Sequence, residues 1–431
     1  MTRRHRLPYL PSSPTEFITM SQCPFANLLN PDTYAQGMPY QALKEIRQQG
    51  PVVKIDDPLT GIPYWAVVGQ QELDFVSKNP ALFSSAKRTA FPMEFPQDEV
   101  DFIHCHTIIN MDPPRHQKVR RIVREAFTPK RVNSYEPAFR AHAKNILDRV
   151  VQRGECEFVE EVAAELPLVA ILELLGVPIE DRKQFFEWTN TMMFADDPDM
   201  MVSTEDGQIA AGECINYSLR LAAQHREQPM HNITSALLEG DVDGEPISEE
   251  DFAWMFILIL VGGNESTRTV ISHGMRLLME HPDQLDYLVQ NPDKITAAID
   301  EILRYNTAFI QMRRTATEDI ELGGQHISAG DKVMLHYHAV NHSEDVFGDD
   351  AMTFDVRRSE RMPKLSQQLR SFGIGQHFCI GSHLARLELQ VMFEEIIPRL
   401  RNPKLTRNIA YTRSYFVNGI KNMHISFDAN T

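Results

Sequence analysis

One cysteine lies within the glycine-rich stretch Phe372-Gly373-Ile374-Gly375-Gln376-His377-Phe378-Cys379-Ile380-Gly381. Glycines allow backbone angles and close approaches that side chains prevent, so this loop can lie flat against a large partner. Directly after it, Leu384, Leu387 and Val391 recur at helical spacing, which predicts an amphipathic helix that ends near Pro398. Cys379 then precedes a helix N-terminus, where amide groups favour a thiolate. Such a thiolate suits an axial ligand of haem iron, although a buried structural cysteine fits the same turn.

The composition is that of a globular protein. The chain has 431 residues, of which 42% are hydrophobic and 24% charged, enough for a substantial core. Its net charge of −16 argues against binding to nucleic acid or to an anionic membrane surface. The five cysteines show no paired spacing, which is typical of a reducing compartment and predicts a cytoplasmic protein. No apolar run approaches the ~20 residues that a transmembrane segment needs.

Helical patterns dominate the chain, with few strands. Helices are predicted over 39–49, 132–153, 157–176, 181–193 and 207–227, and a β-hairpin over Val52–Ile55 and Tyr64–Val68. Residues 84–110 lose this periodicity and mix aromatic with polar residues. They are predicted to form a long loop that faces a substrate, although a plain surface loop fits as well. Residues 1–20 contain several prolines and predict a loosely ordered N-terminal arm.

A long helix is predicted from the capping residues Ser248–Asp251 to about Glu280. At 1.5 Å per residue it would be ~50 Å long, enough to cross the molecule. Its middle carries Gly262-Gly263-Asn264-Glu265-Ser266-Thr267, and two glycines inside a buried helix cost about 1 kcal/mol each. Close packing against the helix or a local opening would offset this cost, and the polar residues after the glycines favour the opening. Because buried carboxylates rarely lack a partner, Glu265 is a candidate site residue.

Two other helices carry charged pairs. Glu301 and Arg304 are three residues apart and can pair on one face. Asp112-Pro113-Pro114 predicts a helix start, after which His116 and Arg120 share a face. The same helix carries a basic stretch formed by Arg115, Lys118, Arg121 and Arg124. This stretch is either a solvated helix face or a docking patch for an acidic partner.

From about residue 30 onward, the order and spacing of these motifs resemble the cytochrome P-450 superfamily of haem-thiolate monooxygenases, in particular its soluble bacterial members. The resemblance rests on four motifs: 262–267, Glu301-x-x-Arg304, Phe354-Asp355-x-x-Arg358 and Phe372-x-x-Gly375-x-x-x-Cys379-x-Gly381. It implies a mainly α fold with minor β, in which haem lies between the long central helix and the helix after the cysteine loop. It also implies that residues 21–431 form a single catalytic domain.

The resemblance implies a role for each matching residue. Cys379 matches the thiolate that binds the iron of haem b, and Glu301, Arg304 and Arg358 match a structural ion-pair triad. Groups that hold the haem propionates are matched by His116, Arg120, Arg314 and His377. Glu265 and Ser266 match the acid–alcohol pair that passes protons to dioxygen, the co-substrate. The family usually has Thr at the position of Ser266, so Thr267 or Asn264 could share the role.

The chain lacks a Gly-x-Gly-x-x-Gly dinucleotide motif, so the resemblance implies electrons from NAD(P)H through a separate reductase and a ferredoxin. The basic stretch would be the docking surface for this ferredoxin. The substrate pocket is expected to combine the loop 84–110 with the mainly apolar residues Leu258, Val261, Gly262, Ile310, Phe416 and Val417.

Two segments bear on the substrate. Residues 263–268 and 415–421 are similar to those of bacterial members that hydroxylate linalool-type terpenoids or sterol side chains. We therefore expect hydroxylation of a terminal or allylic methyl group of a terpenoid, a steroid side chain or a fatty chain. The alternatives are a peroxide-driven oxygenase and a haem protein that binds or senses a ligand without turnover. Retention of an acid–alcohol pair at Glu265 and Ser266 favours the monooxygenase.

Overall fold

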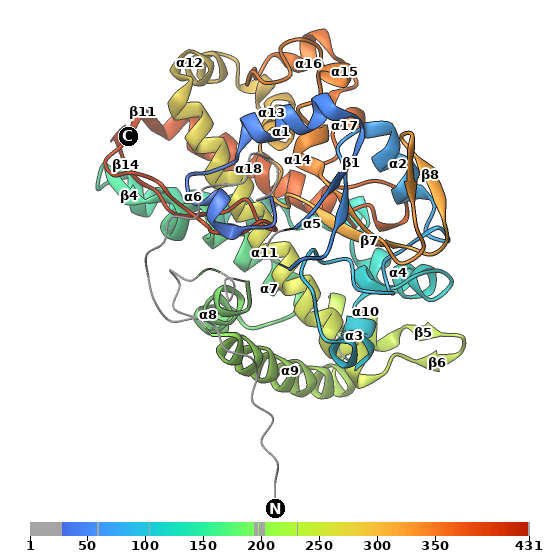
Figure 1. Ribbon diagram of the computed structural model, residues 1–431. Helices are drawn as coiled ribbons and strands as arrows, with labels where there is room; N and C mark the ends of the chain where they lie inside the picture. The colour runs from blue at the N-terminus through green and yellow to red at the C-terminus, as the bar shows by residue number, and fades with distance from the viewer. Residues whose placement is uncertain are drawn as a thin grey trace, which may run out of the picture.

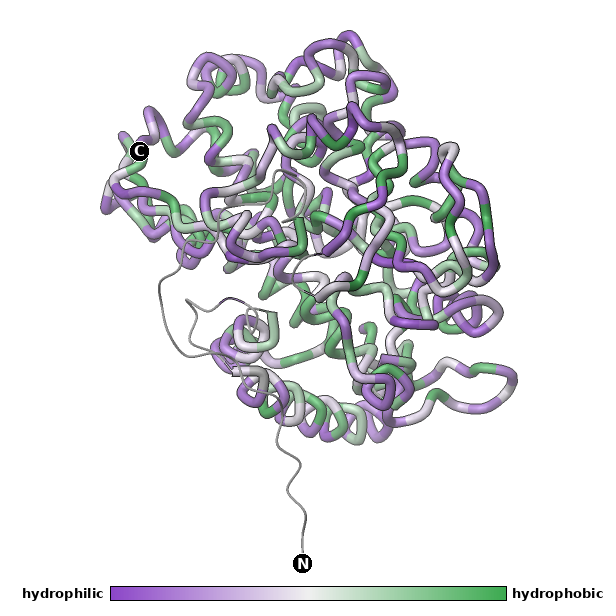
Figure 2. The backbone as a smooth tube through the Cα atoms, in the orientation of Figure 1, coloured by the Kyte–Doolittle hydropathy of each residue, from purple (hydrophilic) through white to green (hydrophobic). Residues whose placement is uncertain are grey.

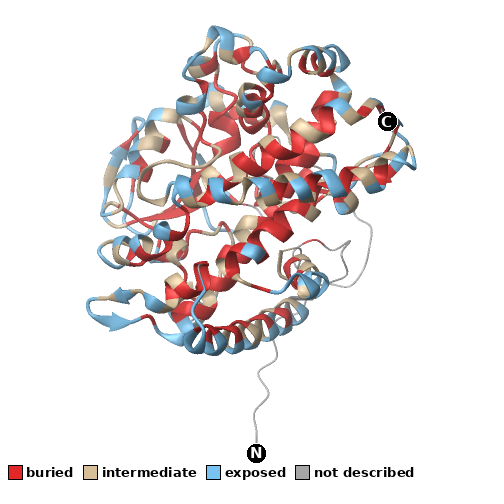
Figure 3. Cartoon of the chain, turned by 180° about the vertical axis from the view of Figure 1, so that it is seen from behind, coloured by how far each residue is buried: buried red, intermediate tan, exposed pale blue. Residues whose placement is uncertain are grey.

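A helix of 32 residues, α11 (Glu249–Glu280), crosses the middle of the computed structural model, and other elements pack around it (Figure 1). The structure describes residues 28–57, 60–102, 104–193, 197, 203–230 and 232–429. The Ser248 hydroxyl accepts a hydrogen bond from the Asp251 amide at 3.0 Å and caps α11, which is largely buried (Figure 3). The long helix predicted from these capping residues is confirmed. The arm predicted over residues 1–20 lies outside the described residues.

Most other elements are helices, as predicted. The longer ones are α1 (Tyr40–Gln49), α2 (Gln70–Lys78), α4 (Arg115–Ala126), α6 (Glu136–Val151), α7 (Glu165–Leu175), α8 (Arg182–Met193), α9 (Thr204–Glu227), α12 (Pro282–Gln290), α13 (Ile295–Tyr305) and α18 (Ser382–Arg399). The shorter ones are α3 (Gln97–Phe102), α5 (Pro129–Ser134), α10 (Ile233–Glu239), α14 (Tyr337–Val340), α15 (Glu344–Phe347), α16 (Arg358–Arg361) and α17 (Leu365–Gln368). None of the helices in the described ranges combines the length and the apolar character that crossing a membrane requires.

The strands form small sheets. The largest has five strands in the order β1 (Val52–Ile55), β2 (Tyr64–Val67), β10 (Lys332–Leu335), β7 (Met312–Ala316) and β3 (Phe83–Ser84). Its first two strands are the predicted antiparallel hairpin, with Val52 opposite Val67. The smaller sheets are β11 (Leu400–Leu405) with β14 (His424–Ala429) and β4 (Glu155–Glu157), β12 (Ala410–Tyr411) with β13 (Ile420–Asn422), β5 (Asp241–Val242) with β6 (Glu245–Pro246), and β8 (Ile320–Leu322) with β9 (Gln325–Ile327).

The apolar core surrounds α11, and separate clusters cover the five-stranded sheet. Successive side chains of a strand point to opposite faces. In β2, Trp65 and Val67 therefore pack into one cluster, and Tyr64 and Ala66 into another. Figure 2 shows polar and apolar residues alternating along α9 at the lower edge of the molecule, as expected for a helix with one buried face.

The glycines in the middle of α11 do not open the helix, contrary to expectation. The helix is continuous from Glu249 to Glu280. A Cβ atom at Gly263 would lie 2.7 Å from Cδ1 of Ile171, so the glycine lets α7 pack closely without a shift of this side chain. A Cβ atom at Gly262 would meet no atom within 4 Å, because Gly262 borders a cavity.

Candidate active site

Two glycines shape the loop that carries Cys379. Gly373 and Gly375 have φ angles of +67° and +74°, which residues with side chains rarely adopt. At Gly375, a Cβ atom would also lie 2.3 Å from the backbone oxygen of Ser77, near the end of α2. The Cys379 amide donates a hydrogen bond of 2.9 Å to the carbonyl of Phe372. These constraints hold the loop against α2 and fix Cys379 just before the start of α18.

Cys379 lies on the wall of a cavity of about 260 Å³ that is also lined by α11 and α18. Most of the other lining side chains are apolar; they include Ile108, Ile109, Ile171, Met255, Leu258, Ile259, Phe309 and Leu384. From α11, Gly262, Ser266 and Thr267 reach the same cavity. A thiol, two hydroxyl groups and a largely apolar surface therefore share one enclosed space.

The protein alone does not favour ionisation of the Cys379 thiol. Burial raises its pKa, against a lowering by the Gly381 amide and by the Arg120 guanidinium. The stabilisation expected from the N-terminus of α18 is therefore outweighed by burial. A metal cation bound to the sulfur reverses this balance, because a coordinating thiol is deprotonated.

Four cationic or hydrogen-bonding side chains line the cavity from three elements: His116 and Arg120 in α4, Arg314 in β7, and His377 in the turn η8 (Gly375–His377). His116 is 1% exposed, and neither of its ring nitrogens has a hydrogen-bond partner among the described residues. Burial, with smaller contributions from Arg120 and Arg314, lowers the pKa of His116 to about 4. Burial also lowers the pKa of Arg314 and of His377.

No carboxylate of the described chain forms an ion pair with Arg314, whose Nη1 donates at 2.6 Å to the Arg313 carbonyl. The rings of His116 and His377 lie 4.2 Å apart, and His377 Nε2 is 3.2 Å from the Ser85 hydroxyl. A buried cluster of donors without an acid fits a ligand that brings carboxylates of its own. The two propionates of haem meet this requirement, and the open side of Gly262 leaves room for a flat group. The residues present therefore fit the haem that the resemblance implies.

The proposed relay residues of α11 do not all face the cavity. Ser266 and Thr267 line it, and their hydroxyls donate to the carbonyls of Gly262 at 2.9 Å and of Gly263 at 3.5 Å. Glu265 does not line it; this buried carboxylate accepts a hydrogen bond of 2.8 Å from Arg268. Burial raises the pKa of Glu265, and Arg268 lowers it.

Of the residues predicted to form the substrate pocket, Leu258 and Gly262 line this cavity, whereas Val261, Ile310, Phe416 and Val417 do not. The cavity-facing stripe of α11 runs through 255, 258, 259, 262, 266 and 270, so Val261 falls off this face. Beyond α13, Phe309 supplies the lining side chain. Ile310 is instead fully buried behind it, and its amide donates to Phe416 O at 2.8 Å. The Phe416 ring packs 4.9 Å from that of Phe309, and Val417 pairs with Phe309 through the backbone.

The stretch 84–110 contributes to the cavity through different residues from those expected. It contains α3 and two short turns, η2 (His104–His106) and η3 (Ile108–Asn110), and the side chains of Ile108 and Ile109 line the cavity. The aromatic residues lie outside the lining. Phe91 and Phe95 pack on His104, with ring centroids 5.9 and 4.2 Å away, while Phe102 is 76% exposed.

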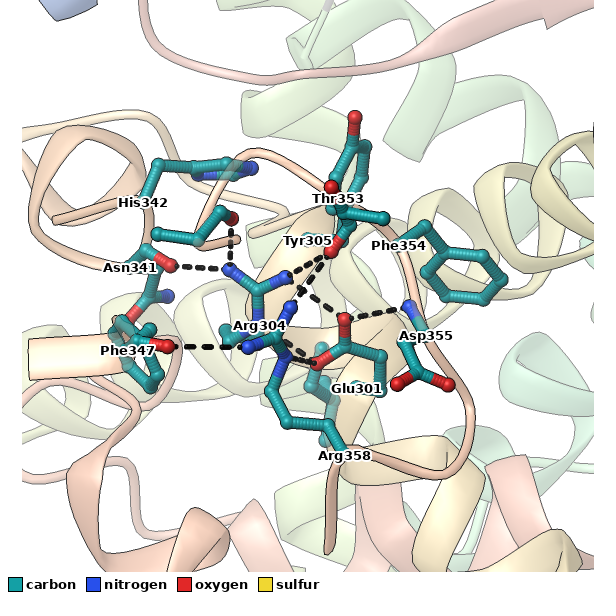
Figure 4. A network of polar contacts seen from close by, with 12 residues as sticks. Glu301, Arg304, Tyr305, Asn341, His342, Phe347, Thr353, Phe354, Asp355 and Arg358 are labelled. Carbon is teal, nitrogen blue, oxygen red and sulfur yellow. Dashed lines mark hydrogen bonds and ion pairs between the residues drawn. The ribbon is translucent and has the colours of Figure 1, made fainter. Parts of the chain in front are cut away.

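Glu301, Arg304 and Arg358 form the predicted ion-pair triad (Figure 4). Oε2 of Glu301 accepts hydrogen bonds from Arg304 Nε at 2.7 Å and from Arg358 Nε at 3.0 Å. The remaining donors of Arg304 bind Glu301 Oε1 and the carbonyls of Asn341, Ala351 and Thr353. All three side chains are at most 1% exposed. The triad thus ties α13 to the segment around α16.

Asn341 connects the triad to the cysteine loop. Its carbonyl accepts from Arg304, and its side chain donates to Ser371 Oγ at 2.9 Å and accepts from the Arg370 amide at 2.7 Å. Ser371 Oγ in turn donates to the carbonyl of Leu303 at 2.6 Å. The position of the loop therefore depends on the triad through a short chain of hydrogen bonds.

The sequence motifs do not single out Glu388, which lines the cavity from α18. It is 1% exposed, burial raises its pKa well above the ordinary range, and the Thr267 hydroxyl lowers it. A signal for it exists in the sequence. Glu388 lies four residues after Leu384 and three before Val391, so an acid interrupts the apolar face of the predicted helix.

Known proteins resemble the chain over nearly its whole length. The family model for cytochrome P450 matches residues 213–407. The chain is 36% identical over 406 residues to a steroid C26-monooxygenase from Rhodococcus jostii, covering 92% of this chain and 84% of the relative. It is 35% identical over 405 residues to a linalool 8-monooxygenase from Pseudomonas putida, covering 93% and 98%.

A solved structure agrees with these relatives. A Mycobacterium marinum cytochrome P450 in complex with pseudoionone superposes with a TM-score of 0.83 at 30% identity, covering 96% of this chain and all of the other. The predicted fold class, mainly α with minor β in the cytochrome P-450 arrangement, is confirmed. Identity above 30% over nine-tenths of the sequence, together with the shared fold, shows that this chain belongs to the cytochrome P450 family.

Proposed function

We propose that this cytochrome P450 monooxygenase hydroxylates a terminal or allylic methyl group of a lipophilic substrate. The observation that carries the proposal is the cavity, in which the Cys379 thiol and donors without acid partners share the lining with apolar side chains. A terpenoid, a steroid side chain or a fatty chain fits such a surface. Relatives named for steroid and linalool oxidation support this class.

In this proposal the sulfur of Cys379 would bind the haem iron. The haem, when bound, supplies the iron at which dioxygen is activated. His116, Arg120, Arg314 and His377 would hold its propionates, because those carboxylates would provide the acidic partners that these four groups lack among the described residues. Leu258, Ile259 and Met255 keep water away from the substrate, and Gly262 leaves space beside α11.

Protons reach the reacting oxygen through the polar residues of α11. Ser266 and Thr267 each bond to the preceding turn, so rotation about χ1 can turn either hydroxyl into the cavity. Ser266 rotates more freely than the usual threonine, because it lacks the methyl group. Glu265 serves as the acid of this pair only when its ion pair with Arg268 opens. Asn264 contributes less, because it donates to Thr189 and does not line the cavity.

Electrons come from NAD(P)H through a reductase and a ferredoxin that docks on α4. The basic stretch is smaller than the sequence indicates, because Arg115 binds Asp251 and Lys118 binds Asp243. Arg121 and Arg124 are exposed and form no ion pair within the described ranges. Reversal of both charges is expected to lower the ferredoxin-supported rate and its salt dependence. Reversal of Lys404 and Arg407, exposed on the C-terminal segment, is the matched control; equal effects would rule out the patch.

Carbon monoxide tests the haem-thiolate assignment. Reduced protein with carbon monoxide should show the Soret band diagnostic of thiolate ligation, and Cys379→Ser should lose it. A haem-loaded wild-type protein without this band would contradict the assignment. A panel of terpenoids, steroids and fatty acids then tests the substrate class through the spin-state shift of the ferric protein. At least one lipid should produce the shift, and silence from all of them would contradict the class.

A further inference from the structure

Two stacked histidine rings lie in the interior between α1, α13 and α14. The ring centroids of His338, in α14, and His342 are 4.6 Å apart, with an angle of 25° between the ring planes. Tyr40 of α1 lies 5.4 and 5.3 Å from the two rings, and Tyr305 of α13 lies 4.9 Å from that of His342. Both histidines are at most 1% exposed. Neither ring lines the cavity, so the pair lies outside the site around Cys379.

The two rings have unused hydrogen-bonding positions. Both ring nitrogens of His338 and Nε2 of His342 have no hydrogen-bond partner among the described residues. Nδ1 of His342 lies 2.9 Å from the His338 carbonyl. Because a carbonyl only accepts, this nitrogen carries the hydrogen and leaves Nε2 as an unused acceptor. Each neutral ring therefore keeps one nitrogen lone pair that a proton can occupy.

The surroundings of the pair oppose a charge on either ring. Burial lowers the pKa of both histidines well below the ordinary value of 6.5, and neighbouring cations and rings act in the same direction. The titratable and charged groups that face the pair are Tyr40 and Arg47 from α1, His273 from α11, Arg304 and Tyr305 from α13, His336 before α14, and Arg358 from α16. The carboxylates of Glu344, Glu301 and Glu280 are bound by Arg47, Arg304 and Arg276. A proton on either ring would therefore be a buried charge without an acid against it among the described residues.

The segment that carries the pair also holds the cysteine loop. Asn341 directly precedes His342, and its side chain bonds to Ser371 and to the Arg370 amide at the start of the loop. Its carbonyl accepts a hydrogen bond of 2.8 Å from Arg304, the same guanidinium that acts on the His342 ring (Figure 4). A charge on His342 would repel Arg304 and strain this hydrogen bond. Movement of the segment would therefore reach the cysteine loop through the neighbouring residue.

We propose that the His338–His342 pair is an acid-sensitive switch for the cysteine loop. While both rings are neutral, the segment that carries them holds the loop in place. When a ring takes a proton from solvent, the segment moves, Asn341 releases the loop, and the sulfur of Cys379 leaves the position in which it would bind iron. Return of the proton to solvent restores the arrangement. The inference rests on the proposed function, because it concerns the ligation of iron by Cys379, and it adds control by pH.

The pH dependence of this switch has a definite sign. The closed arrangement holds neutral rings, whereas an opened one exposes them to water, where their pKa returns to the ordinary value of 6.5. The closed arrangement is therefore fully favoured above pH 6.5 and is lost as the pH falls toward the depressed pKa values of the pair. Each ring changes the ratio of closed to opened molecules by up to about tenfold per pH unit. Two rings together should make the loss steep.

The thiolate Soret band of the reduced holoenzyme with carbon monoxide, followed as the pH is lowered, tests the switch. In wild type the fraction with this band should fall in acid and recover when the pH is raised again. His338→Gln and His342→Gln each remove one titrating ring. Each should therefore lower the number of protons in the transition by about one and move its midpoint to lower pH. His326→Gln, the same change at an exposed histidine paired with Glu321, is the matched control and should leave the midpoint unchanged.

A midpoint and a steepness that stay as in wild type in both variants would overturn the inference. If neither variant binds haem, hydrogen exchange of the wild-type holoenzyme decides. After correction for intrinsic rates, segments 336–343 and 370–381 should lose protection together in acid, while α11 keeps it. Loss of protection in α11 at the same pH would mean general unfolding and would also overturn the inference. If wild type lacks the thiolate band at neutral pH as well, the proposed function fails instead.

Discussion

The molecule contains two buried groups of charged side chains that differ in how they are satisfied. Around Glu301, each N–H of the Arg304 guanidinium has an acceptor, and Arg358 closes the network. Around the cavity, neither ring nitrogen of His116 has a hydrogen-bond partner within the described residues, and Arg314 forms no ion pair there. Buried polar groups without partners destabilise a fold. The first group therefore maintains the architecture, and the second keeps its hydrogen-bonding capacity for a ligand.

The largest effect on stability is expected in the network around Glu301. Glu301→Gln leaves Arg304 buried without a carboxylate and Arg358 with Asp350 alone, which should cost about 3–5 kcal/mol of unfolding free energy. Urea unfolding of the haem-free protein measures it. Glu136→Gln removes one partner of an exposed ion pair with Arg140 and should change stability by less than ~1 kcal/mol. Equal losses in the two variants would show that the network has no special weight.

A smaller loss of unfolding free energy is expected at Asn341, which connects the network around Glu301 to the cysteine loop. Asn341→Ala removes the side-chain hydrogen bonds to Ser371 and to the Arg370 amide, and should cost about 1–3 kcal/mol. The cysteine loop should also become less ordered, so the reduced protein with carbon monoxide should show a smaller thiolate fraction. An unfolding free energy that falls while this fraction stays constant would mean that Asn341 supports only the triad.

For the side chains around the cavity, we expect a change in unfolding free energy of the opposite sign. Arg314→Met removes a buried cation that lacks an acid, so the haem-free protein should be unchanged or more stable by about 1 kcal/mol. The same variant should lose haem faster to an acceptor globin, since a propionate loses its partner. A clear destabilisation of the haem-free protein would instead place Arg314 with the architectural charges.

The smallest effect concerns pH. Burial lowers the pKa of His116 from 6.5 to about 4, so the folded haem-free protein binds fewer protons than the unfolded chain between these values. The stability contribution of neutral His116 is present above pH 6.5 and is lost as the pH falls toward 4. His116→Gln should flatten the stability profile over this window, and bound haem should do the same because propionates favour the charged ring. Identical slopes in all three proteins would contradict this account.

The fold was largely predictable because its signals are local. The capping box at Ser248, the hairpin pattern around Tyr64 and the glycines of the cysteine loop each specify a conformation from neighbouring residues. The triad was also predictable, since the spacing of Glu301 and Arg304 matches a helix face. The resemblance to a family supplied what spacing alone does not, namely that Arg358 completes it.

The site was less predictable because its lining depends on which face each segment presents. Gly262 and Phe309 reach the cavity, whereas their sequence neighbours Val261 and Ile310 do not. The side chain that packs closely on Gly263, Ile171, comes from a helix some 90 residues earlier in the chain. Contacts between segments so distant in sequence cannot be predicted from local hydrophobic periodicity. Glu388 was open to prediction, because it is an acid on the apolar face of a predicted helix.

The clamp between the cysteine loop and α2 has a consequence for how the enzyme matures. Gly375 lies against Ser77, and Arg370 pairs with Asp74 at 2.6 Å across 296 residues of sequence. Contacts of such long range form late in folding, because loop closure must precede them. A cofactor held by this loop would therefore find its site complete only after the segments around Asp74 and Arg370 have met.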